Sequence, residues 1–184
     1  MTYTIFFARI VFIYTVFTSI ALCKPYDLKF GTIDIPKGFV MEHENTTDRN
    51  FMKYRFDKSD VKTKQTTYIT IVSYNYKNDT GYEKNKARDE ILISYIQDTI
   101  IAHRKNNPVT FIGKPGRIKI GGKSGVTVLL GNDDKLNAYI SSISATLSGD
   151  NVIVFYVIEP DYIEPRILFD IMDRIESFKY NGKS

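Results

Sequence analysis

The segment Gly121-Gly122-Lys123-Ser124 has the residue types with which phosphate-binding loops hold a nucleotide. Such a loop needs a further glycine five positions before the glycine that precedes the lysine, and this position holds Arg117. The residues that follow, Val126-Thr127-Val128, are typical of a strand, whereas a phosphate loop opens into a helix. The segment is therefore predicted to be a hairpin turn and not a nucleotide site.

Potential metal ligands are few. The chain has two histidines, His43 and His103, and one cysteine, Cys23, and polar surface roles are expected for both histidines. The segment Asn132-Asp133-Asp134 offers oxygen ligands for calcium, but it lacks the spaced ligands of a calcium loop and fits turn chemistry. No metal and no cofactor is predicted.

Catalytic motifs are also missing from the sequence. The serines are not set in a Gly-x-Ser-x-Gly elbow, and no base partner for them stands out. Glu159 and Asp161 flank Pro160, where helix capping explains both acids. The sequence therefore predicts a protein that is not an enzyme, with a hydrolase of unrecognised site kept as an alternative.

Tyrosine is common, with 13 in the chain, and it suits protein cores and protein interfaces equally well. Both interpretations stay open: core packing, or a protein-binding surface on an exposed part of the sheet or on the polar loops 57–65 and 131–135. On the second interpretation, the candidate binding residues are Tyr74, Tyr76, Asp133 and Asp134.

The elements that position these residues centre on the stretch from Arg117 to Ile158, which predicts a run of antiparallel strands. Turns rich in Gly, Asn and Asp separate a hairpin, a strand over Asn137–Leu147 and a strand over Val152–Ile158. The last strand is apolar on both faces, so each face of the sheet should be covered by a helix.

Three more strands are predicted before this stretch. They are a strand from Leu28 to Ile35 that ends at Pro36-Lys37-Gly38-Phe39, a strand over Phe51–Phe56 and a strand over Thr67–Tyr76. Residues 43–50 and 57–65 are expected to be loops.

Two helices complete the prediction. One starts at the capping box Thr80-Gly81-Tyr82-Glu83 and stops at Asn106-Asn107-Pro108. The other starts near Asp161, with Glu164 and Pro165 in its first turn, and ends at Asn181-Gly182. Its buried stripe consists of Ile167, Leu168, Ile171, Met172, Ile175 and Phe178.

The fold class is therefore α+β, with a predominantly antiparallel sheet flanked by two main helices. In this order of elements the chain resembles the superfamily of PsbP-like proteins, Mog1 and the DcrB-related proteins. The motifs that carry the resemblance are Phe30-Gly31-Thr32-Ile33-Asp34-Ile35-Pro36-Lys37-Gly38-Phe39, Ile120-Gly121-Gly122-Lys123 and Ile175-Glu176-Ser177-Phe178-Lys179. The resemblance implies accessory and binding proteins, and it transfers no functional residue.

The N-terminal residues are predicted to be a secretory signal peptide over residues 1–23. Ile10 to Leu22 is almost wholly apolar, and Ala21 and Cys23 are small residues at positions −3 and −1 of a cut before Lys24. An uncleaved anchor and a lipid-modified Cys23 stay open as alternatives. Residues 24–184 are predicted to be a single domain, exported to the periplasm or secreted.

The predicted mature chain has a net charge of +3 that is spread along the sequence, so nucleic acid is not an expected partner. Three functions remain. The first is an exported accessory protein that binds another protein, with an immunity protein against a toxin as one form. The second is a carrier of a small ligand or ion in a cleft between sheet and helix, and the third is the hydrolase.

Overall fold

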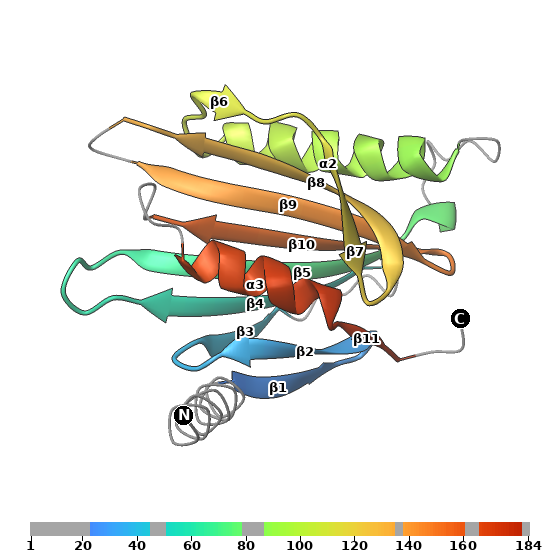
Figure 1. The fold of residues 1–184 in the computed structure, drawn as a ribbon, viewed down its shortest axis with the longest axis horizontal. Coiled ribbons are helices and arrows are strands. Elements are labelled where there is room, and N and C mark those ends of the chain that lie inside the picture. The colour runs from blue at the N-terminus through green and yellow to red at the C-terminus, as the bar shows by residue number, and fades with distance from the viewer. Residues whose placement is uncertain (1–22, 45–50, 79–86, 135–137, 161–165, 182–184) are drawn as a thin grey trace, which may run out of the picture.

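The computed structural model describes residues 23–44, 51–78, 87–134, 138–160 and 166–181. Within these residues the chain forms two sheets, two α-helices and one short 3-10 helix (Figure 1). The strands are β1 (Cys23–Leu28), β2 (Gly31–Pro36), β3 (Val40–Glu44), β4 (Phe51–Ser59), β5 (Thr66–Asn75), β6 (Phe111–Ile112), β7 (Gly116–Ile120), β8 (Lys123–Asn132), β9 (Tyr139–Ser148), β10 (Asn151–Glu159) and β11 (Lys179–Tyr180). The helices are η1 (Tyr76–Asn78), α2 (Arg88–Arg104) and α3 (Arg166–Glu176).

The larger sheet has eight strands, and all of its pairings are antiparallel. Its strand order is β3-β4-β5-β10-β9-β8-β6, and β7 also pairs with β8. The smaller sheet has the order β1-β2-β11. The predicted α+β class, with a predominantly antiparallel sheet and two main helices, is confirmed.

Each face of the larger sheet has its own core, because β10 is apolar on both sides. Ile153, Phe155 and Val157 pack with α3 and with the smaller sheet. Val152 and Val154 pack with α2. The expectation of one helix on each face is therefore confirmed, and α2 and α3 lie on opposite sides of the sheet (Figure 1).

The predicted meander is confirmed as β7 to β10. Gly121 and Gly122 form the turn between β7 and β8, with φ angles of 55° and 76° that favour glycine. A strand follows this turn, as expected for a hairpin and not for a phosphate loop.

The single strand predicted from Leu28 to Ile35 is wrong. The structure has a hairpin, in which β1 ends at Leu28 and β2 begins at Gly31. The apolar residues change phase between Phe30 and Ile33, and this change marks the turn.

Two predicted loops are shorter than expected. Residues 43 and 44 of the expected 43–50 loop belong to the edge strand β3, which pairs with β4. The 57–65 loop also shrinks, because β4 continues to Ser59 and β5 starts at Thr66.

The helix ends also differ from the prediction. The capping box at 80–83 lies outside the described residues, and the described helix begins at Arg88. Here Glu90 Oε2 accepts a hydrogen bond from the Ala87 amide at 3.1 Å. The predicted extension of the closing helix to Asn181 is wrong, because α3 ends at Glu176 and β11 pairs with β2.

Candidate binding site

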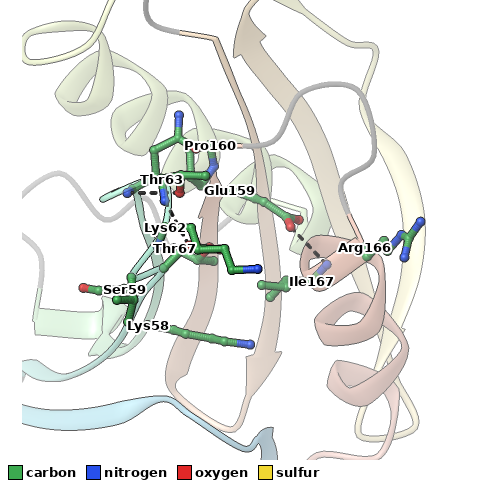
Figure 2. A pocket seen from close by; sticks show the side chains of 12 residues that line it. Lys58, Ser59, Lys62, Thr63, Thr67, Glu159, Pro160, Arg166 and Ile167 are labelled. Atoms are coloured by element: carbon green, nitrogen blue, oxygen red, sulfur yellow. Dashed lines mark hydrogen bonds between the residues drawn. The ribbon is translucent and has the colours of Figure 1, made fainter.

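An open pocket of about 730 Å³ lies where the β4–β5 loop, the end of β10 and the start of α3 meet (Figure 2). We term it the hairpin pocket. Much of its lining comes from the polar 57–65 segment, which the sequence offered as one candidate binding surface. The lining residues are Lys58, Ser59, Asp60, Val61, Lys62, Thr63, Gln65, Thr67, Glu159, Pro160, Arg166 and Ile167.

The floor of the hairpin pocket is a row of side chains across three neighbouring strands. Lys58 of β4 pairs with Thr67 of β5. Tyr68 pairs with Ile158, so Thr67 comes opposite Glu159, the next residue of β10. Cross-strand neighbours project from the same face of a sheet, and here this is the face that α3 covers. The pocket therefore depends on the register of β4, β5 and β10.

Glu159 fixes the start of α3 against this floor. Its side chain is only 4% exposed, and its Oε2 and Oε1 atoms accept the backbone amides of Leu168 at 2.7 Å and Ile167 at 3.2 Å. These amides would otherwise lack partners at the start of the helix, and the carboxylate also complements the helix dipole. The capping role predicted for Glu159 is confirmed, whereas Asp161 lies outside the described residues.

The rim of the hairpin pocket is a structured turn. Asp60 Oδ1 accepts the amides of Lys62 at 2.7 Å and Thr63 at 3.0 Å, and these bonds lower the pKa of the Asp60 carboxyl. The Asp60 amide in turn donates to the Gln65 carbonyl at 2.8 Å. The turn leaves Val61 at its tip, where the side chain is 93% exposed.

The acidic and the basic side chains of the hairpin pocket differ in the contacts that they make within the protein. Its acids, Asp60 and Glu159, hold backbone amides of the protein itself. Lys58 places Nζ 5.8 Å from the centre of the Phe39 ring. Lys62 makes no ion pair with a described residue. Arg166 is exposed at the start of α3. The pocket therefore offers the Lys62 cation to a ligand, next to the exposed apolar side chain of Val61.

A second cavity, of about 370 Å³, lies between α2, β8 and the connection from β6 to β7. We term it the helix groove. Gln97 is its one polar lining side chain among the described residues, and the lining consists of Ile93, Ile96, Gln97, Ile100, Ile101, Ile112, Gly113, Pro115, Val126 and Val128. A cleft between sheet and helix was expected for a small-ligand carrier.

The two tyrosines predicted for binding lie on or near the α2 side of the sheet. Tyr74 is half-buried, with its ring centroid 5.6 Å from that of Tyr95 and 6.5 Å from that of Phe51. Tyr76 is 9% exposed and belongs to the core beneath α2. Both rings pack within the protein, and a role in partner binding stays a prediction.

The two aspartates predicted for binding follow the end of β8 and do not line the hairpin pocket. Asp133 Oδ1 accepts the hydroxyl of Thr110 at 2.7 Å. The Asp134 amide donates to Asn132 Oδ1 at 3.2 Å, as expected for a turn of this composition. The structure brings neither aspartate together with Tyr74 or Tyr76, and their role in binding also stays a prediction.

Of the two residues predicted to mark the processing site, Ala21 lies outside the described residues. Cys23 is the first residue of β1 and a free thiol, and burial raises its pKa. Cleavage or lipid modification at this position stays a prediction.

The surface role predicted for His103 is wrong. His103 lies in the last turn of α2, is 5% exposed and contacts Tyr139 and Tyr156 of the sheet. The side chain of His43 lies outside the part of the structure that is described.

The hydrogen bonds around His103 define its tautomer. Tyr139 donates to the Pro108 carbonyl at 2.7 Å, so its oxygen is left to accept from His103 Nε2 at 2.6 Å. The Asn107 side-chain amide, 3.2 Å away, and the Tyr156 hydroxyl both approach Nδ1 as donors. The ring is thus neutral, and burial lowers its pKa.

The described residues hold no group of three or more His, Cys, Asp or Glu side chains that could bind a metal ion. Within the same ranges, neither α2 nor α3 is long and apolar enough to cross a membrane.

No protein-family model matches the sequence. No curated protein matches it either. Solved structures match in fold. The solution structure of cyanobacterial PsbP (CyanoP) from Synechocystis sp. PCC 6803 aligns with a TM-score of 0.54 at 12% identity, over 87% of this chain and 93% of that chain.

The crystal structure of LpqN, which is involved in cell envelope biogenesis of Mycobacterium tuberculosis, aligns with a TM-score of 0.52 at 11% identity, over 87% of this chain and 86% of that one. A Mog1 mutant aligns with a TM-score of 0.44 at 13% identity, over 84% and 86%. The matches to CyanoP and LpqN confirm the PsbP-like fold expected from the sequence motifs, and at these identities the likeness is one of fold alone.

Proposed function

We propose that this chain is an exported, non-catalytic accessory protein that binds another protein, and that the partner docks at the hairpin pocket. The observation that carries the proposal is an open pocket of about 730 Å³ with the exposed Lys62 and the 93% exposed Val61 at its rim. Exposed apolar side chains beside shaped polar surfaces are typical of interaction sites.

The charges of the pocket favour an acidic segment of the partner. Asp60 and Glu159 already hold backbone amides, whereas Lys62 is exposed. A carboxylate of the partner would gain a charge-assisted hydrogen bond there. Val61 would supply the apolar contact beside it, as hydrophobic anchors do at the centres of interfaces.

The fold neighbours fit an accessory role, but they do not identify the partner. LpqN is involved in cell envelope biogenesis. Together with the predicted signal peptide, this supports a role outside the cytoplasm for the present chain. If the partner proves to be a toxin, the chain would be an immunity protein.

The test is capture of the partner from the cell envelope of the source organism. The full-length gene is expressed there with a C-terminal tag, and co-eluting proteins are identified by mass spectrometry. The expected result is one stoichiometric partner that is lost from Val61→Asp and from Lys62→Glu. Both positions are exposed, so these variants should keep the unfolding midpoint of the unchanged protein.

The matched control is Lys105→Glu, which reverses an exposed lysine after α2, outside the hairpin pocket. It should retain the partner. A partner that binds both pocket variants as well as the control would show that docking uses another surface, and Tyr74→Ala would then test the sheet. Capture of no protein would overturn the proposal.

A second candidate function is that of a small-ligand carrier, and the helix groove favours it. Its volume of about 370 Å³ falls within the range of about 300 to 1,000 Å³ found for ligand pockets. The groove and the hairpin pocket share no lining residue, so the two functions can be tested separately.

A further inference from the structure

The helix groove has two aliphatic walls and an aliphatic floor. One wall is a stripe of α2 with Ile93, Ile96, Ile100 and Ile101, and the other is the β6–β7 connection. The floor is β8. None of the described residues that line the groove is aromatic, so a ring-shaped ligand would find no stacking partner among them. A flexible alkyl chain matches this lining.

Exposure of the walls indicates that the helix groove is a surface for binding and not a gap within the core. Ile101 of α2 is 56% exposed, and Ile112 of the opposite wall is 44% exposed. Among the described residues, six large hydrophobic side chains are exposed, and two of them meet here. A ligand that covers both would remove apolar surface from water, which is favourable.

Some of the charged side chains near the helix groove form ion pairs, and others do not. Asp89 lies one turn before Ile93, and both of its carboxylate oxygens bind Arg117 of β7, at 2.8 and 2.5 Å. This pair joins α2 to β7. Because the carboxylate of Asp89 is engaged, it compensates no other cation of the rim.

The uncompensated cations are Lys114 and Arg104. Lys114 lies between the lining residues Gly113 and Pro115, and Arg104 follows Ile100 and Ile101 by one turn of α2. Both are exposed, and neither forms an ion pair with a described residue. A carboxylate at this rim would find opposite charge.

We propose that the helix groove binds a single-chain fatty acid, with the alkyl chain between the isoleucines and the carboxylate beside Lys114 and Arg104. This inference rests on the second candidate function and names its ligand class. The aliphatic lining favours the alkyl chain of the ligand, and the cations at the rim favour an anionic head group over a neutral one. The proposal is independent of docking at the hairpin pocket.

Methyl NMR tests the proposal on the unchanged protein, because five of the lining residues are isoleucines. Dodecanoate is titrated below its micelle concentration into protein with labelled isoleucine methyl groups. The methyl signals of Ile93, Ile96, Ile100, Ile101 and Ile112 should shift and saturate. Those of Ile33 and Ile171, in the core beneath α3, should stay unchanged.

Variants then test separately the binding of the alkyl chain and the binding of the carboxylate. Ile101→Asp places a charge in the helix groove and should abolish binding, while Val40→Asp, a 67% exposed apolar site on β3, is its control. Lys114→Glu should weaken dodecanoate binding about fivefold, as a lost exposed ion pair does, and should leave dodecanol binding unchanged. The unfolding midpoint of each variant is measured first.

Each outcome decides a separate part of the proposal. Unshifted groove methyl groups, or equal binding by Ile101→Asp, would overturn the site. Dodecanol binding as tight as dodecanoate, with no effect of Lys114→Glu, would overturn the anionic head. Neither result bears on partner capture, because the capture variants Val61→Asp and Lys62→Glu lie outside the helix groove.

Discussion

The Nε2 atom of His103 and the hydroxyl oxygen of Tyr139 lie 2.6 Å apart, and this buried hydrogen bond joins the last turn of α2 to the first residue of β9. The Tyr156 hydroxyl contacts the other ring nitrogen. One imidazole thus links the helix to two strands of the sheet, and it does so in its neutral form.

Replacing this imidazole should destabilise the protein. His103→Leu leaves the Tyr156 hydroxyl in the core without its histidine partner, which should lower the free energy of unfolding by about 1–3 kcal/mol. Urea unfolding followed by circular dichroism measures the loss. Lys105→Ala, at an exposed position two residues on, is the control. A loss no larger than that of the control would mean that the tyrosine contacts do not stabilise the fold.

The stability of the protein should depend on pH through the same residue. Burial lowers the pKa of His103 from 6.5, so between the folded and unfolded pKa values the unfolded chain binds more protons. This contribution is fully present above the unfolded pKa and is lost as pH falls through the folded pKa. The free energy of unfolding, measured from about pH 7.5 to about pH 5, should fall with decreasing pH. The slope of His103→Leu should be smaller, and identical slopes would exclude His103 as the cause.

The cap at the start of α3 gives a third prediction. Glu159→Ala removes the acceptor of two buried helix amides and should lower the free energy of unfolding by about 2 kcal/mol. Glu159→Gln keeps one acceptor oxygen and should lose less. Glu176→Ala removes an acid from the other end of the same helix, where the dipole disfavours it, and should be neutral or slightly stabilising. Equal losses for Glu159→Ala and Glu176→Ala would contradict the cap.

The turn between β7 and β8 offers a matched pair of glycines. Both have positive φ, so alanine at either position should cost about 1–2 kcal/mol in backbone strain. A Cβ on Gly122 meets no atom within 4 Å, whereas a Cβ on Gly121 would lie 2.3 Å from the Phe178 carbonyl oxygen. Thermal unfolding should therefore show a clearly larger loss for Gly121→Ala than for Gly122→Ala. Equal losses would show that the chain after α3 moves aside without cost.

Local sequence patterns were sufficient to predict the central strands and the presence of both α-helices. The alternation in β4 and β5 and the glycine turns of β7 to β10 are properties of neighbouring residues, and the structure confirms them. The C-terminal end of the closing helix could not be predicted from local sequence patterns. Phe178 continues the helical stripe in sequence, yet β11 begins one residue later, because Lys179 pairs with Thr32 far along the chain.

The candidate sites were predictable only in part, for the same reason. The polar 57–65 segment was predicted as one possible binding surface, but the hairpin pocket exists because strand register sets Glu159 beside this segment. The sequence also predicted that each face of the sheet is covered by a helix. The apolar face of α2 remains partly open because of the position of the β6–β7 connection, which the sequence did not indicate. His103 was misjudged because its partners Tyr139 and Tyr156 lie 36 and 53 residues away.

The smaller sheet has a consequence for the order of folding. Its central strand β2 lies between β1 and β11, and Asn181 donates hydrogen bonds to Asp27 and to the Leu28 carbonyl across up to 154 residues. During synthesis the β1–β2 hairpin emerges from the ribosome early and waits, with one edge unpaired, until the last described residues appear. Loop closure over such a distance is slow compared with helix formation. Completion of this sheet should therefore be a late, post-translational event.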